Sequence, residues 1–267
     1  MVPGIPSEME ERLLATLDTT VTDATVESFA ACDFTLLDSA DDETRQLGIE
    51  NSGAGNATIV VTDRTRPLGR LKVELRGRQN TLFFDNRAWE GQCYGNLRVL
   101  GSDCVVFFND IGAAYVALPD IYMRSTSQLL FWGRGASAVG CTIELEGAGQ
   151  AVAIGDDALI SSGVSIRNYD MHAMHDLVTG VLISRPPVDT VIERHVWLGQ
   201  DVMLLNCERI GMGTVVGAQS LVKGVLPPRV VAAGTPARVI RENVSWGRDT
   251  YGMTAAERVS IGLSARP

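Results

Sequence analysis

Aliphatic residues recur at every sixth position in the C-terminal half of the chain, and this spacing restricts the folds that the chain can adopt. Two runs show it: Ile192, Leu198, Leu204, Ile210, Val216 and Val222, and upstream Ile154, Ile160 and Ile166. A step of six is a multiple of the strand period of two, whereas residues six apart drift around an α-helix. The pattern therefore predicts short strands joined by turns, three to a coil, each with its aliphatic residue pointing inward.

A single coil of this kind cannot be stable alone. Burying its three aliphatic side chains contributes roughly 1.5–3 kcal/mol each, whereas ordering each backbone residue costs roughly 1–2 kcal/mol. Contacts between coils must supply the difference, so we expect several coils stacked at the usual strand separation of ~4.8 Å.

Weaker repeats extend the pattern upstream. Gly53, Gly77 and Gly101 recur at 24-residue intervals, and each is followed by a short apolar segment. We interpret these as wider coils of the same solenoid, beginning at about residue 55; a separate β-sandwich is the alternative. The predicted organisation is an acidic N-terminal cap (1–50), a β-helix (51–245) with a loop at about 169–190, and a helical tail (246–267).

Both ends carry helix-capping sequences. Ser7 with Glu10, and Thr254 with Glu257, have the spacing of a capping box. They predict a short helix to about Leu17 and a second helix near the C-terminus.

Charge and cysteine content exclude several classes of protein. The net charge is −9 and the acidic residues are concentrated in residues 1–50, which argues against broad nucleic-acid binding. Residues 222–241 contain no acidic residue, so this window could bind a small polyanion. No apolar run reaches the roughly 18 residues of a membrane span, and no secretory signal is recognisable, so we expect a cytoplasmic protein. The five scattered cysteines include no C-x-x-C pair and indicate reduced core thiols.

The order of short motifs resembles the hexapeptide-repeat acetyltransferase family, most closely the branch that O-acetylates capsule and O-antigen sugars. The matching segments are Asp170-Met171-His172 with Asp176, Val196 to Gly199, Ile210-Gly211, Val216 to Ser220, and Ala233 to Ile240. The close match covers roughly residues 140–245. The resemblance implies a mainly β, left-handed parallel β-helix, a homotrimer with active sites between subunits, and acetyl-CoA as cosubstrate.

Two positions depart from the family pattern. Cys207-Glu208 stands where the family usually has Gly and a small or apolar residue, which predicts a distorted corner. Lys223-Gly224 lies in a stretch one residue shorter than usual, so Lys223 matches its family position approximately.

Acyl transfer from a thioester needs a base, a donor for the oxyanion, and a site that aligns two substrates. His172 is the candidate base, because it falls where the six-residue register breaks and an imidazole accepts a proton at neutral pH. Asp170 or Asp176 is expected to hydrogen-bond its other ring nitrogen. A polar loop histidine without a catalytic role is the alternative. His175 and His195 have weaker cases, His195 as a structural residue.

The resemblance also assigns the residues that contact the cosubstrate. Trp197 has two interpretations. It is either a large side chain on the outer face of a coil, or, as the resemblance implies, it lies next to the thioester. In the second case its backbone N–H or its ring binds the acetyl group. Gln200 and Ala218 are one 18-residue turn apart and should stack at one corner. The residues expected to contact coenzyme A are Gly199, Gln200, Gly217 and Ala218 along the pantetheine arm, and Lys223, Arg238 and Arg241 at the phosphates and adenine.

The predicted function is transfer of an acetyl group to a hydroxyl, less readily an amine, of a saccharide acceptor. A γ-type carbonic anhydrase, which holds zinc with three histidines, shares the solenoid; His172, His175 and His195 lack its spacing, and we expect no metal. A non-catalytic β-helix scaffold is the other alternative. The acceptor is not readable from the sequence.

Overall fold

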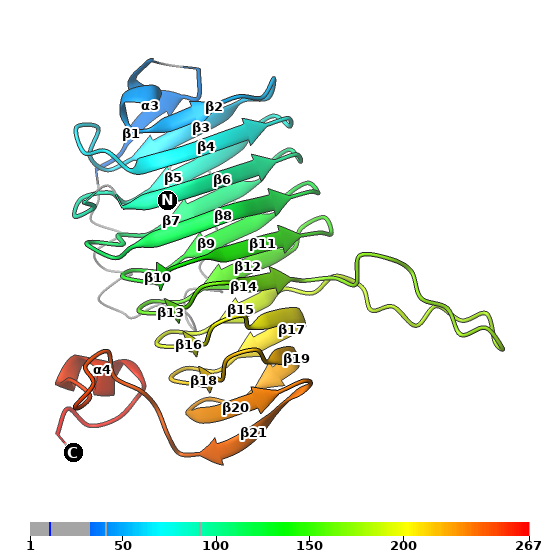
Figure 1. The fold of residues 1–267 in the computed structure, drawn as a ribbon. Helices are drawn as coiled ribbons and strands as arrows, with labels where there is room; N and C mark the ends of the chain where they lie inside the picture. The colour runs from blue at the N-terminus through cyan, green and yellow to red at the C-terminus, as the bar shows by residue number, and fades with distance from the viewer. Residues whose placement is uncertain (1–10, 12–32, 41, 91, 267) are drawn as a thin grey trace.

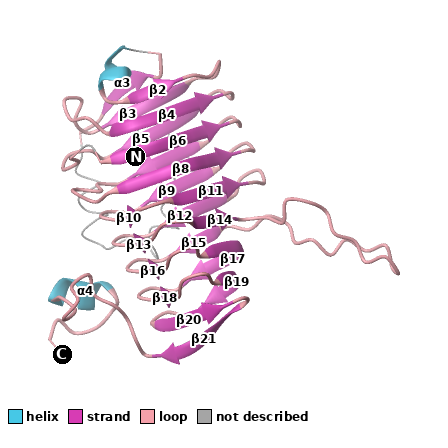
Figure 2. Cartoon of the chain, viewed as in Figure 1, coloured by secondary structure: helices cyan, strands magenta, loops and turns pink. Residues whose placement is uncertain are grey.

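The chain folds into a triangular prism of stacked coils (Figure 1). The computed structural model describes residues 11, 33–40, 42–90 and 92–266. The predicted helix from Ser7 to about Leu17 therefore lies outside the described residues, apart from Glu11. Figure 2 shows how strands dominate the described part of the chain.

Three faces make up the prism. The first face contains β3 (Ala57–Val61), β5 (Asn80–Phe84), β7 (Val105–Phe108), β9 (Leu129–Trp132), β12 (Ala151–Ile154), β15 (Thr190–Ile192) and the end of β17 (Met203–Ile210). The second contains β2 (Ile49–Asn51), β4 (Gly69–Leu75), β6 (Cys93–Val99), β8 (Val116–Met123), β11 (Cys141–Leu145), β14 (Val164–Arg167), the start of β17, and β19 (Leu221–Leu226). The third contains β10 (Ser137–Ala138), β13 (Leu159–Ile160), β16 (Trp197–Leu198), β18 (Val215–Val216) and β20 (Val230–Gly234).

Antiparallel elements close the two ends of the stack. β1 (Thr35–Asp38) pairs with β3, followed by the short helix α3 (Asp42–Gln46). β21 (Ala237–Glu242) pairs with β20 at the other end. The helix α4 (Ala255–Ser260) begins at the predicted capping box, in which Thr254 and Glu257 each accept a hydrogen bond from the other's backbone N–H. No helix in the described ranges is long and apolar enough to cross a membrane.

The six-residue repeat builds the core as predicted. The repeated aliphatic residues from Ile154 to Val222 are all buried in one continuous cluster. The parallel ladder runs on without interruption into the upstream coils, so the β-sandwich alternative is wrong. Those coils are wider, with 24 residues between ladder partners, and aromatic rings fill part of their interior: Phe84 stacks on Phe108 at 5.7 Å, and Phe108 on Trp132 at 5.8 Å.

Three corners join the faces, and each carries a different feature. The strap corner, between the first and third faces, comprises residues 155–158, 193–196 and 211–214. The glycine corner, between the third and second faces, comprises 199–202 and 217–220. The arm corner joins the second face to the first and carries the arm, residues 168–189, which projects far from the prism (Figure 1).

The arm is an insertion into an otherwise regular stack. Ile166 is 38 positions from its ladder partner Leu204, whereas Leu204 is only 18 positions from its own partner Val222. The corner one coil further on is distorted, as predicted: the register of β17 against β19 shifts on both sides of Cys207. Four of the cysteines are buried free thiols, as expected, and Cys32 lies outside the described residues.

Candidate active site

The arm is an extended hairpin with one antiparallel bridge, between His175 and Leu182, and it carries both His172 and His175. The N–H of Ile183 donates to the carbonyl of Met174 at 2.8 Å, and the N–H of Asp176 donates to the carbonyl of Val181 at 2.9 Å. Both histidines are exposed. The backbone carbonyl of His172 accepts a hydrogen bond from the Ser184 hydroxyl at 3.2 Å, which fixes the chain beside the imidazole and leaves the ring accessible.

The two aspartates expected beside His172 make other contacts in this chain. Asp176 accepts hydrogen bonds from the N–H groups of Thr179 and Val178 at 2.7 and 2.9 Å, and these bonds lower the pKa of its carboxyl group. Asp170 accepts from the N–H of Arg185 at 3.3 Å. Among the described residues, none hydrogen-bonds the imidazole of His172: backbone N–H groups bind both carboxylates, and Lys223 lies near Asp170 alone.

Lys223 lies at the base of the arm. Its Nζ is 4.0 Å from Oδ1 of Asp170, two coils above it. Arg238 and Arg241 are exposed on β21, opposite Ala233 and Val231 of the third face. The acid-free window therefore spans more than one side of the prism.

The glycine corner brings together the other predicted contacts. The register of β16 against β18 stacks Gln200 over Ala218, as predicted, and both are exposed. A Cβ at Gly199 would lie 2.7 Å from the N of Ala218, so only glycine allows the coils to approach this closely. A Cβ at Gly217 would be 3.1 Å from that of Ala233.

Two backbone N–H groups at this corner have no protein acceptor among the described residues. The carbonyl of Gln200 accepts the N–H of Gln219 at 2.8 Å, but no group in the described part of the chain accepts a hydrogen bond from the N–H of Gln200 or of Ala218. Because both residues are exposed, these two amides can donate to a ligand that lies along the corner.

Trp197 lies on the outer side of the third face and is 38% exposed. Its backbone N–H donates to the carbonyl of Thr214 at 2.9 Å, inside the ladder between coils. Of the two donors considered for this residue, the backbone N–H is therefore already used, and only the indole is free to contact a ligand. A pocket of about 660 Å³ lies beside this ring, between the third face and the C-terminal segment.

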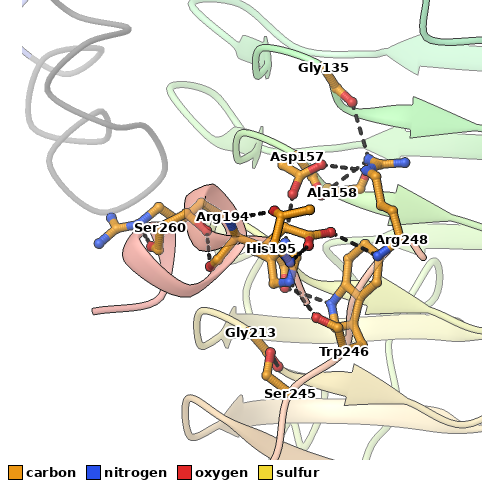
Figure 3. Close-up of polar contacts among 12 residues, drawn as sticks. Gly135, Asp157, Ala158, Arg194, His195, Gly213, Ser245, Trp246, Arg248 and Ser260 are labelled. Carbon is orange, nitrogen blue, oxygen red and sulfur yellow. Dashed lines mark hydrogen bonds and ion pairs between the residues drawn. The ribbon is translucent and has the colours of Figure 1, made fainter. Parts of the chain in front are cut away.

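His195 is buried at the strap corner, in agreement with the structural role expected for it (Figure 3). Its Nδ1 lies 2.6 Å from Oδ2 of Asp157, and its Nε2 lies 2.8 Å from the carbonyl oxygen of Trp246. The imidazole and indole rings stack at 4.3 Å. The register of Leu159 against Trp197 places Asp157 directly over His195, a pairing that the coil repeat could have revealed. The contact with Trp246 has no such signal.

The cluster of Asp157, His195 and Glu257 resembles a metal site in composition but not in its bonding. Both nitrogens of His195 already have partners, Arg248 donates to Asp157 at 2.5 Å, and Glu257 accepts from the N–H groups of Arg248 and Thr254. Since every potential ligand atom here is engaged, these residues do not fit a zinc ion. A buried His195 also cannot join His172 and His175 around a shared metal.

Comparisons with known proteins give a consistent result. WbbJ of Escherichia coli (strain K12), provisionally named a lipopolysaccharide biosynthesis O-acetyl transferase, is 30% identical in an alignment 148 positions long, which covers 45% of this chain and 75% of WbbJ. The galactoside O-acetyltransferase of the same strain is 42% identical over 94 residues, or 34% of this chain and less than half (44%) of that protein. No family model matches the chain.

Among solved structures, the polySia specific acetyltransferase NeuO superposes with a TM-score of 0.53 at 23% identity, covering 78% of this chain and 92% of NeuO. At this identity the likeness concerns the fold alone. It confirms the left-handed parallel β-helix.

Proposed function

Because this chain belongs to the hexapeptide-repeat O-acetyltransferase family, we propose that it transfers an acetyl group from acetyl-CoA to a hydroxyl group of a saccharide. The relatives' names support this reaction and this class of acceptor, since they describe O-acetyl transfer in lipopolysaccharide biosynthesis and to galactosides. Acetyl-CoA is a cytoplasmic metabolite, so the proposed reaction takes place in the cytoplasm.

The observation that carries the proposal is the pair of unused backbone donors at the glycine corner. The amide N–H groups belong to two exposed residues, Gln200 and Ala218, which lie one coil apart at the glycine corner that follows Trp197. A pantetheine arm carries two amide carbonyls that can accept such hydrogen bonds, and the absence of a side chain at Gly199 and Gly217 allows it to approach the backbone. Arg238 and Arg241, which are exposed on β21 beside the third face, are the cations proposed to bind the phosphates.

The catalytic centre is proposed to form between two copies of the chain. The arm and the glycine corner lie at opposite edges of the second face, separated by roughly 15–20 Å of extended chain. A base on the arm therefore reaches a thioester at the glycine corner of a neighbouring copy more readily than one on its own. A closed homotrimer, in which each copy gives an arm to the next, satisfies every site.

In this arrangement His172 acts as the general base. Its imidazole takes the proton of the acceptor hydroxyl, and the oxygen attacks the thioester carbonyl carbon to give a tetrahedral oxyanion. The indole N–H of Trp197 is a donor for the acetyl oxygen. The C–S bond then breaks, the sugar keeps the acetyl group, and the coenzyme A thiolate recovers the proton from the imidazolium. Asp170 and Asp176 support His172 indirectly, by fixing the shape of the arm at its base and its tip.

A coenzyme A release assay tests the proposed activity. Purified protein is mixed with acetyl-CoA and with a panel of sugars, nucleotide sugars and oligosaccharides, and the free thiol is measured against controls without protein or without acceptor. We expect acceptor-dependent release, with an O-acetyl ester in the product by mass spectrometry. Acceptor-dependent release with an amide product would replace O-acetylation by N-acetylation, and a chain with no measurable affinity for acetyl-CoA would be a scaffold instead.

A further inference from the structure

The chain after the last coil folds back along the strap corner instead of leaving the prism. We call residues 244–262 the C-terminal strap. The Ser245 hydroxyl donates to the carbonyl of Gly213 at 2.8 Å, and the indole N–H of Trp246 donates to the carbonyl of His195 at 2.9 Å. The guanidinium of Arg194 reaches the carbonyl of Ser260 near the end of the strap (Figure 3).

Arg248 fixes the middle of the strap. Its Nε donates to the Asp157 carboxylate at 2.5 Å, and its Nη2 reaches the carbonyls of Gly135 and Ala158 at 3.3 and 3.4 Å (Figure 3). These two carbonyls belong to two successive turns: Ala158 lies in the strap corner, and Gly135 lies in the corresponding turn one coil before it. Arg248 is therefore engaged with the prism, and the backbone that follows it is held at a defined distance from the third face.

Between the strap and the third face lies the pocket of about 660 Å³. Leu159 and Trp197 form its wall on the prism, and Trp246, Tyr251 and Met253 form its wall on the strap. The Trp197 and Trp246 rings lie 5.9 Å apart at an angle of 53°. Tyr251 is 97% exposed, so its ring is available to a ligand without any rearrangement of the core.

The pocket lies on the far side of Trp197 from the coenzyme residues. Along the coil the chain runs from His195 at the strap corner, through Trp197, to Gln200 at the glycine corner. If the pantetheine arm follows the glycine corner and its thioester reaches Trp197, the pocket is the next space beyond the acetyl group. This step rests on the function proposed above.

We propose that this pocket binds a neutral pyranose ring of the acceptor. The exposed faces of Tyr251 and Trp197 suit the C–H face of a sugar, as aromatic side chains combine apolar surface with a polar edge. One oxygen of Asp249 accepts the N–H of Tyr251 at 2.7 Å, and the other, without a partner in the described part of the chain, accepts from a sugar hydroxyl. The Arg248 cation is already bound to Asp157 and Asp249 is anionic, so an acidic sugar is disfavoured here.

Binding in the absence of coenzyme A tests this subsite independently of catalysis. Tryptophan fluorescence is titrated with the methyl glycosides of glucose, galactose, mannose, N-acetylglucosamine and N-acetylneuraminic acid. We expect the wild-type chain to bind at least one neutral glycoside more tightly than the acidic one. Tyr251→Ala should weaken that binding roughly five- to tenfold, and Tyr251→Phe, which keeps the ring, should retain it.

Leu36→Ala is the matched control, because Leu36 is exposed and lies on β1 at the other end of the prism. The proposal is overturned if wild-type protein binds none of these glycosides, if it prefers the acidic one, or if Tyr251→Ala binds as wild type does. Where coenzyme A release is measurable, Tyr251→Ala should raise the KM for the acceptor and leave the KM for acetyl-CoA unchanged. A raised KM for acetyl-CoA with an unchanged KM for the acceptor would show that the pocket binds acetyl-CoA instead. Sugar binding without coenzyme A release would keep the subsite and refute the proposed reaction instead.

Discussion

At the scale of single residues, the arm uses its aspartates and His172 differently from what the sequence suggested. The sequence predicted that Asp170 or Asp176 hydrogen-bonds His172, whereas in the structure both aspartates shape the hairpin. Asp176 closes the tip of the hairpin through the N–H groups of Val178 and Thr179, and Asp170 anchors its base through Arg185 and Lys223. His172 lies between them with an accessible ring. This exposed position suits a side chain that acts on a substrate bound to a neighbouring copy of the chain.

His172→Ala should reduce acetyl transfer by roughly 10²–10⁴-fold, the usual contribution of a general base. Binding of acetyl-CoA should change little, because the glycine corner is on another part of the prism. The measurement is kcat from coenzyme A release together with the Kd for acetyl-CoA. His175→Ala is the control on the same hairpin and should keep most of the activity; near-normal turnover of His172→Ala would remove this imidazole from the mechanism.

Spacing in the sequence could place His172 in a loop, but it could not choose the hydrogen-bond partners of Asp170 and Asp176. That choice depends on which donor is nearest once the chain turns, and in a tight hairpin the backbone N–H groups come first. The same limit applies to Trp197, whose backbone N–H is committed to Thr214 by the ladder. The stacking of Gln200 over Ala218 was predictable because it follows from the repeat alone.

At the scale of elements, the strap depends on two carboxylates whose charged forms are stabilised by the fold. Burial raises the pKa of Asp157, but hydrogen bonds from His195 and Arg248 outweigh it, and the pKa falls below its ordinary value of 3.8. Burial also raises the pKa of Glu257, but the N–H groups of Arg248 and Thr254 lower it below its ordinary value of 4.5. Depressed carboxyl pKa values mean that the strap is most stable above these ordinary values and loses stability as the pH falls below them.

We therefore expect acid to release the strap before it unfolds the prism. Trp246 fluorescence and limited proteolysis after residue 243 should report release as the pH falls below about 4. Asp157→Asn should destabilise the strap by about 1.5–3 kcal/mol at neutral pH, the range for hydrogen bonds to charged groups, and should reduce the acid transition. Asp103→Asn, at a corner of a wide coil, is the control. An unchanged acid transition in Asp157→Asn would show that this carboxylate does not hold the strap.

The packing of the C-terminal strap against the prism could not be predicted from the sequence. The capping box at Thr254 and Glu257 correctly predicted α4, but a helix signal says nothing about where the helix packs. Arg248 meets Asp157 across 91 positions of sequence and Trp246 meets His195 across 51, and no repeat relates either pair. Long-range contacts outside a repeat leave no periodic trace.

At the scale of the whole molecule, the repeat predicted the prism because each coil depends mainly on its neighbours. The wider coils have 24 residues between ladder partners instead of 18, and aromatic rings fill part of their interior. The tip of the arm is one apolar surface that a single prism leaves uncovered. Leu177 and Val178 are 98% and 96% exposed there, and Val181, Leu182 and Ile183 are also exposed. An apolar hairpin of this kind is typical of a segment that packs against another copy.

The double variant Leu177→Asp, Val178→Asp should weaken assembly, because two charges would be buried in an apolar interface. Light scattering should find a trimer for wild-type protein and smaller species for the variant, with coenzyme A release reduced in parallel. Leu36→Asp, on exposed β1, should leave the mass unchanged. A monomeric wild-type chain that turns over normally would contradict the inter-copy site.

The strands on either side of the arm stay in register with their neighbours, since β14 pairs with β17, and β15 pairs with β12, without a shift. Changes in the length or composition of this hairpin should therefore leave the strand pairing of the neighbouring coils unaltered. Homologous chains can therefore differ in the length and sequence of the segment that carries His172 while the β-helix keeps its packing. The distance over which the imidazole acts and the selectivity for the acceptor can then evolve faster than the β-helix itself.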